Sequence, residues 1–93
     1  MLHAFVLIDA EPARIAPLAE ALAETDGIAE VHSVAGGVCD LVAIVRVRHH
    51  DDLAEVVTKK ISALDGIEST TTLVAFQAFS RHDLEALWDI GPA

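Results

Sequence analysis

The sequence predicts an α+β fold in which strands and helices follow one another in the order β-α-β-β-α-β. Three features carry this prediction: four stretches rich in Val, Ile and Phe, two stretches with apolar residues at helical spacing, and an internal repeat. The repeat is Asp-Gly-Ile at 26–28 and again at 65–67, an offset of 39 residues. Two such copies suit two βαβ halves related by a pseudo-twofold axis, as in the ferredoxin-like fold. We therefore expect a four-stranded antiparallel sheet with helices on one face.

The first half of the chain supplies a strand, a helix and a strand. The first strand is predicted at 2–10, where Phe, Val and Ile are frequent. The helix follows, with Pro12 and Pro17 near its start and Gly27 as its stop. The second strand is expected at 28–34. The apolar positions that define the helix, at i, i+3, i+4 and i+7, are Ile15, Leu18, Ala19 and Leu22.

The second half repeats this order. The third strand is predicted at 40–48, and the fourth at 67–79. Between them a second helix is expected to end at Gly66, and Asp52 with Glu55 three residues on resembles a capping box at its start. A short helix capped by Ser80 closes the chain, so we divide it into a domain at 1–80 and a tail at 81–93. The apolar positions of the second helix are Leu53, Val56, Val57, Ile61 and Leu64.

Composition excludes several classes of protein. The net charge of −9 argues against binding of DNA or RNA by this chain alone, because phosphate binding needs a basic face. The longest apolar run, LVAIV, is far too short to span a membrane, and no secretory signal precedes it. A single cysteine excludes an internal disulfide and fits a cytoplasmic location. With 93 residues, we expect one domain.

Both faces of the third strand are apolar, which a monomer with helices on one face does not require. An uncovered apolar face would be adhesive, so we predict an obligate homodimer packed sheet to sheet. The apolar residues of the tail are available to extend that contact or to start a higher assembly. The alternating positions of the strand are Leu41, Ala43, Val45 and Val47 against Val42 and Ile44, and the tail residues are Leu84, Leu87 and Trp88.

Two stretches are candidates for a ligand site. The connection Gly36-Gly37-Val38-Cys39 is longer than a tight hairpin needs, so it is either a bulge or irregular hairpin, or a backbone shaped to hold a ligand. The run Ser-Thr-Thr-Thr at 69–72 places Thr70 and Thr72 on one strand face. These are either ordinary strand residues or hydroxyls that line a polar cleft beside the glycine loop.

Other reactive residue types favour plain structural interpretations. A lone Cys39 is more often a small buried hydrophobe than a nucleophile. The His-His-Asp-Asp run at 49–52 has metal-binding residue types, but adjacent residues at a helix start point apart, which favours capping and solvation. The many acids are most simply a solvated surface. We expect no metal and no other cofactor.

The stretches VHSVAGGVCDLVAIVRV and DGIESTTTLVAF resemble the effector-binding domain of the Lrp/AsnC family of amino-acid-responsive regulators. The shared pattern is a valine-rich strand, a Gly-x-x-Asp loop, a second strand, a helix ending in Gly-Val or Gly-Ile, and Thr-x-Thr on an apolar strand. The resemblance covers about residues 2 to 80. Here Cys39 replaces the usual aromatic before the loop Asp, and counting from Gly36 makes the spacing one residue longer. The matching residues are Val34, Gly37, Asp40, Gly66, Ile67, Thr70 and Thr72.

The resemblance implies a regulatory module and not an enzyme. Family dimers commonly assemble into octameric rings, and amino-acid effectors bind between subunits of adjoining dimers. Full-length members carry a helix-turn-helix before this domain, whereas Met1 is here followed at once by the first strand. We therefore expect a stand-alone form that senses an amino acid or co-assembles with a full-length paralogue. The ligand-binding residues carried over are Gly36, Gly37, Val38, Cys39, Asp40, Thr70 and Thr72.

Two rival functions stay open. The dimeric α+β barrel also hosts small enzymes, which should direct a histidine or acid between helices and sheet; His3 and His32 are the candidates. A purely structural oligomer with an empty loop is the other.

Overall fold

The computed structural model describes residues 1–79 and 81, and the expected order of elements is confirmed within this range. The expected Ser80 cap, the tail helix and its apolar residues Leu84, Leu87 and Trp88 lie outside the described residues. The elements are β1 (Leu2–Ala10), the 3-10 turn η1 (Pro12–Arg14), α1 (Ile15–Ala23), β2 (Ile28–Ser33), β3 (Leu41–Val47), α2 (His50–Glu55), the π-helix η2 (Val56–Ile61) and β4 (Ile67–Val74).

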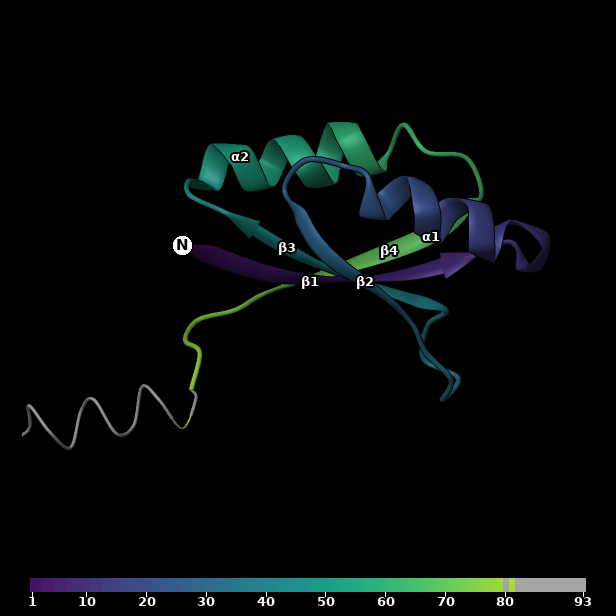
Figure 1. Cartoon of the computed structure of the whole chain (residues 1–93), viewed down its shortest axis with the longest axis horizontal. Helices are drawn as coiled ribbons and strands as arrows, with labels where there is room; N and C mark the ends of the chain where they lie inside the picture. The colour runs from purple at the N-terminus through teal and green to yellow at the C-terminus, as the bar shows by residue number, and fades with distance from the viewer. Residues whose placement is uncertain (80, 82–93) are drawn as a thin grey trace, which may run out of the picture.

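The four strands form one antiparallel sheet in the order β2-β3-β1-β4. Strand β1 lies inside the sheet and pairs with both β3 and β4, so β2 and β4 are the edges. Helices α1 and α2 cover one face, and no helix of the described residues covers the opposite face (Figure 1). This is the predicted ferredoxin-like architecture.

The core lies between the helices and the sheet. Alternate residues of β1 and β3 point into it, as the period of a strand requires. In the described part of the chain no polar or charged side chain is buried. The fully buried side chains with the largest volumes are Ile8, Leu22, Leu41, Ile61, Val6, Val45 and Val56.

The other alternate residues form what we call the open face, the side of the sheet opposite α1 and α2. Its centre is apolar, because Phe5 pairs with Ile44 and Leu73, and Leu7 pairs with Val42. Phe5 is 39% exposed and Leu73 is 51% exposed, so the centre is accessible to a partner. The prediction that both faces of the third strand are apolar is thus supported at Val42 and Ile44. By register, the remaining members are His3, Asp9, Glu30, His32, Arg46, Ser69 and Thr71.

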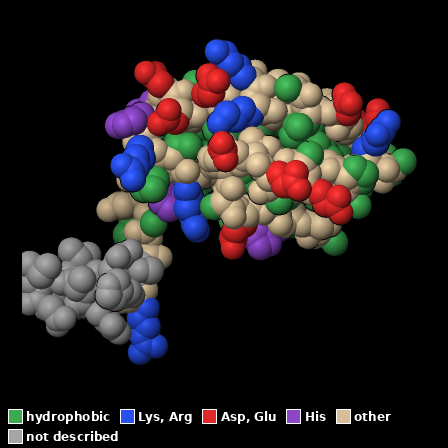
Figure 2. Space-filling view, turned by 45° about the horizontal axis from the view of Figure 1, so that its top comes forward, with side chains coloured by type: hydrophobic (Ala, Val, Ile, Leu, Met, Phe, Trp, Pro, Cys, Tyr) green, Lys and Arg blue, Asp and Glu red, His purple; other side chains and the backbone are tan. Residues whose placement is uncertain are grey.

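Charged side chains are spread over the helix side of the molecule, where acids and bases stand next to one another (Figure 2). Asp51 and Asp52 lie in the first turn of α2, where they complement the helix dipole. The predicted capping box is wrong, however. The N-cap residue is His49, which makes no side-chain cap, and Asp52 is already helical, because the chain turns into the helix within two residues of the end of β3.

Both helices end several residues before the glycines that we expected to stop them. Helix α1 ends at Ala23 and η2 ends at Ile61, so short turns separate them from Gly27 and Gly66. The two glycines share a φ of 96°, in keeping with the repeat. A Cβ on Gly27 would lie 2.6 Å from Val56 Cγ2, so the turn packs directly on the second helical segment. Glycine is needed there for close approach as well as for φ.

Strand β4 is shorter than predicted. The pairing with β1 continues to Ala75, whose N–H donates to the carbonyl of His3 at 2.9 Å, but the strand ends at Val74. Beyond it Phe76 and Phe79 are exposed. No helix among the described residues is long and apolar enough to cross a membrane.

Candidate functional site

The connection between β2 and β3 projects below the sheet, on the side away from the helices (Figure 1). Its base is closed by the N–H of Val34, which donates to the carbonyl of Asp40 at 3.0 Å. Gly36 and Gly37 have φ values of 151° and 82°, and a Cβ on either would meet nothing within 4 Å. The backbone conformation, and not a lack of space, therefore requires glycine at this tip. Val38 beside them is 75% exposed.

Asp40 anchors this hairpin to the central strand. Its backbone N–H donates to the carbonyl of Ile8 at 2.9 Å, and its carboxylate Oδ2 accepts from the backbone N–H of Ala10 at 2.9 Å. The register between β1 and β4 shifts between Asp9 and Ala10. The carboxylate therefore accepts a hydrogen bond from a backbone N–H that lies at this shift in register. The half-buried Asp40 thus stabilises the fold, besides any contact with a ligand.

The hydrogen bond between Asp40 and Ala10 predicts different losses of stability for two substitutions of Asp40. Asp40→Ala leaves the Ala10 N–H without its acceptor and is expected to lower the free energy of unfolding by about 1–3 kcal/mol. Asp40→Asn keeps an acceptor oxygen and is expected to cost clearly less. Urea unfolding at one protein concentration measures both. Equal losses for the two variants would contradict the anchoring role.

Strand β4 places the hydroxyls of the run at 69–72 alternately on the two sides of the sheet. Thr70 and Thr72 pair with Ile8 and Val6 of β1, whose side chains face the helices, so these two threonines lie on the helix side. Thr72 is half-buried and Thr70 is exposed. On the open face, the Ser69 Oγ donates to the Asp9 carboxylate at 2.7 Å.

One protomer does not bring the two candidate stretches into contact. Asp40 and the hairpin extend from β3, Thr70 and Thr72 lie on β4, and β1 runs between them. Two strand spacings amount to about 10 Å. The hairpin also projects on the open side, whereas Thr70 and Thr72 lie on the helix side (Figure 1). A site made of both stretches needs residues from more than one copy.

The remaining sequence candidates are not assembled into a reactive site. Cys39 is a half-buried free cysteine. His3 and His32 lie on the open face and not between helices and sheet, and His32 Nε2 contacts Glu30 Oε2 at 3.5 Å. Within residues 1–79 and 81, no three His, Cys, Asp or Glu side chains are placed to hold a metal ion. Neither histidine therefore lies at the position that the rival enzyme would need.

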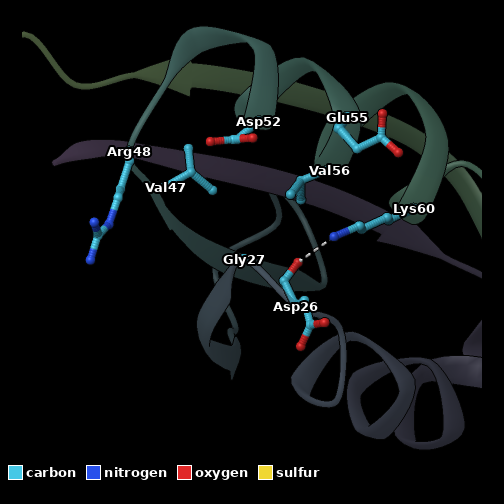
Figure 3. Close-up of a pocket in the computed structure, with 8 residues that line it drawn as sticks. All are labelled: Asp26, Gly27, Val47, Arg48, Asp52, Glu55, Val56 and Lys60. Atoms are coloured by element: carbon cyan, nitrogen blue, oxygen red, sulfur yellow. Dashed lines mark hydrogen bonds between the residues drawn. The ribbon is translucent and has the colours of Figure 1, made fainter.

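Two surface depressions that the sequence did not indicate lie beside the two Asp-Gly-Ile turns. The first, of about 200 Å³, is lined by charged side chains around Gly27 and Val56 (Figure 3). In it Lys60 Nζ donates to the carbonyl of Asp26 at 3.3 Å and so ties η2 to the turn. The second depression, beside Asp65 and Arg14, is lined mainly by residues of apolar type. The repeat was the signal that could have located both. Neither depression is lined by a residue of the hairpin at 34–40 or of β4.

Comparison with known proteins bears on these stretches. The family model of the Lrp/AsnC ligand binding domain matches residues 3–84. The crystal structure of TTHA0845 from Thermus thermophilus is 48% identical, with a TM-score of 0.81 over 87% of this chain and 100% of that one. The structure of E. coli AsnC is 27% identical, with a TM-score of 0.75 over 83% of this chain and 52% of that one.

A curated relative is considerably longer than the region it shares with this chain. An uncharacterised HTH-type transcriptional regulator of Pyrococcus abyssi (strain GE5 / Orsay) is 35% identical over 71 residues, which are 76% of this chain. The chain spans 44% of the length of that regulator.

Proposed function

Because the chain belongs to the Lrp/AsnC ligand-binding domain family, we propose that it is a non-enzymatic regulatory module that binds an amino acid between copies of itself. The observation that carries the proposal is the separation of its two candidate stretches. The hairpin at 36–40 and the threonines of β4 lie on either side of β1 and on different sides of the sheet. An effector that contacts both would join neighbouring copies, and its binding would therefore respond to assembly.

The exposed groups suit the two ends of an amino acid. The backbone N–H groups of Gly36, Gly37 and Val38 donate no hydrogen bond to another described residue and can receive a carboxylate. At Asp40, Oδ2 is occupied by Ala10, while Oδ1 has no hydrogen bond among the described residues and can receive an ammonium. Hydroxyls of Thr70 and Thr72 from another copy complete the polar set.

Assembly is part of the same proposal. The apolar centre of the open face is expected to be buried in a homodimer, with a gain of about 25 cal/mol for each Å² of apolar surface removed from water. Further apolar side chains outside that face, Val38, Phe76 and Phe79, are exposed at 75%, 106% and 72%. They are available for contacts between dimers in a ring.

A thermal-shift screen against the twenty amino acids tests the binding proposal. A ligand that binds only the folded assembly stabilises it by about 2.7 kcal/mol at a concentration of 100 times Kd, so one amino acid or a small set should raise Tm clearly. Thr72→Val is expected to abolish the rise without lowering the basal Tm by a comparable amount. Asp40→Asn is expected to do the same.

The matched control is Thr71→Val, which makes the same change one residue away on the opposite side of the strand. It should leave the ligand-induced rise intact. A flat panel for the unmodified protein would contradict amino-acid binding. Equal loss in the Thr71 and Thr72 variants would contradict the assignment of the site to the helix side of β4.

A further inference from the structure

The two Asp-Gly-Ile turns differ in what reaches them from the helix layer. At the first turn, Lys60 of η2 lines the depression, and its Nζ donates to the carbonyl of Asp26 at 3.3 Å (Figure 3). The repeat offset of 39 residues places Ala21 of α1 at the position of Lys60, and Asp65 at that of Asp26. Ala21 lines the second depression. The second turn therefore has the carbonyl but lacks the ammonium that meets it at the first turn.

The acceptors of Asp65 have no partner in the described part of the chain. Its carbonyl accepts no hydrogen bond from another described residue. Its carboxylate is exposed and forms no ion pair within residues 1–79 and 81. An ammonium carries three donors, so it can meet a carbonyl and a carboxylate of the same residue together. Asp65 thus offers to a ligand the contact that Asp26 makes within the chain.

The walls of the second depression suit an aliphatic carbon stem. Its volume is about 310 Å³, at the lower end of the roughly 300–1,000 Å³ of small-molecule pockets. A lysine side chain lays its stem along apolar surface while its ammonium meets polar groups. The second depression offers such a surface between α1 and the turn after η2. Its apolar lining residues are Pro17, Leu18, Ala21, Ala63 and Leu64.

The charges around the depression act in opposite directions on a cation. A chain of net charge −9 attracts cations to its surface, and Asp65 adds a local negative charge. Arg14 also lines the depression and repels a cation. A Cβ on Gly66 would lie 2.7 Å from the Arg14 Cβ, so the stem of this arginine packs on the turn. The two lining charges therefore predict effects of opposite sign.

We propose that the second depression binds a small aliphatic primary amine in its protonated form, with the ammonium at Asp65 and the carbon stem along α1. The ligand takes the place that the Lys60 side chain takes beside Asp26. The site lies within one copy of the chain and includes no residue of the hairpin at 34–40 or of β4. It is therefore independent of the proposed amino-acid site.

Titration of n-butylamine tests the proposal. This probe has the four-carbon stem and the ammonium of a lysine side chain, and it is protonated at pH 7 because its pKa is near the value of about 10.4 of lysine. Ligand-observed NMR on the unmodified protein should show saturable binding with a Kd on the order of millimolar. Butan-1-ol has the same stem without the charge and should bind at least about tenfold more weakly.

Neutralisation of each lining charge tests the position of the ammonium. Asp65→Asn should raise the Kd of n-butylamine about tenfold, because the charged acceptor is lost. Arg14→Gln should lower the Kd, because it removes the repulsion and keeps most of the stem on Gly66. The matched control is Glu68→Gln, an exposed acid three residues from Asp65 that does not line the depression. It should leave the Kd within about twofold of that of the unmodified protein.

Exchange of the lysine between the two depressions is the second test. Ala21→Lys supplies the ammonium from the chain itself and should abolish binding, whereas Ala23→Lys, at the exposed end of α1, should not. Lys60→Ala added to Ala21→Lys opens the first depression and should restore binding. Lys59→Ala in the same background should not, because Lys59 does not line that depression. Circular dichroism verifies that each variant is folded.

Four results would overturn the proposal: no saturable binding of n-butylamine, equal binding of butan-1-ol, a Kd that Asp65→Asn leaves unchanged, or a folded Ala21→Lys variant that binds as well as the unmodified protein. Failure of Lys60→Ala to restore binding would contradict the equivalence of the two depressions. Thr72→Val, which is expected to abolish amino-acid binding between copies, should leave the Kd of n-butylamine unchanged. Either proposal can therefore fail without the other.

Discussion

Ile44→Glu is expected to convert the dimer into a folded monomer. Ile44 is half-buried on the open face, at the centre of β3, and pairs with Phe5. In the homodimer both copies would lose the burial of this side chain, worth about 2 kcal/mol each, and a carboxylate would enter an apolar interface. The Kd should therefore rise at least about a thousandfold. In an isolated protomer the same glutamate faces water and disturbs no core residue.

Size-exclusion chromatography with light scattering measures this change, and circular dichroism verifies that the monomer keeps its secondary structure. Ala54→Glu is the matched control, because it adds the same charge at an exposed position of α2. It should remain dimeric. If the Ile44 variant keeps the mass of the unmodified protein, the open face is not the interface.

Gly27→Ala is expected to cause a large loss of stability. The residue has a φ of 96°, which an L side chain rarely adopts, and a Cβ would lie 2.6 Å from Val56 Cγ2 and 3.3 Å from Val47 Cγ1. Backbone strain and overpacking each cost about 1–3 kcal/mol, so a loss of about 2–6 kcal/mol is expected. This is a large part of the roughly 5–15 kcal/mol typical of a domain.

Gly37→Ala is the matched control, because Gly37 also has a positive φ of 82° but a Cβ there would meet nothing within 4 Å. It should cost only the strain, about 1–2 kcal/mol. Shortening Val56 to Ala in the Gly27→Ala background should recover part of the loss, which a double-mutant cycle in urea measures. Equal losses for the two glycine variants would contradict the role of the contact with Val56.

The strands and their order along the chain could be predicted because they depend on local signals. The frequency of Phe, Val and Ile located β1 at 2–10, the bounds that the structure has, and the repeated Asp-Gly-Ile predicted the pseudo-twofold. The helix ends could not be predicted as well. A glycine marks where the chain turns back, but the helices end earlier, because the last residues before each glycine form a turn of their own.

The site could be predicted only as a set of residue types. That Asp40 accepts from Ala10, 30 residues away, depends on a bulge between two strands that no local pattern reports. Nor does the sequence show that β1 would separate the hairpin from Thr70 and Thr72, since this follows from the strand order. The position of His3 and His32 on the open face likewise follows only from the register.

The hairpin at 34–40 has one more consequence. It is the sole covalent link, within residues 1–79, between the half that ends with β2 and the half that begins with β3. All three strand pairings, β1 with β3, β1 with β4 and β2 with β3, join one half to the other. The halves are therefore interlocked by the sheet itself. A chain cut between Gly36 and Gly37 should stay together as a two-fragment complex, so the tip of the hairpin can change in length and sequence while the core that carries it is preserved.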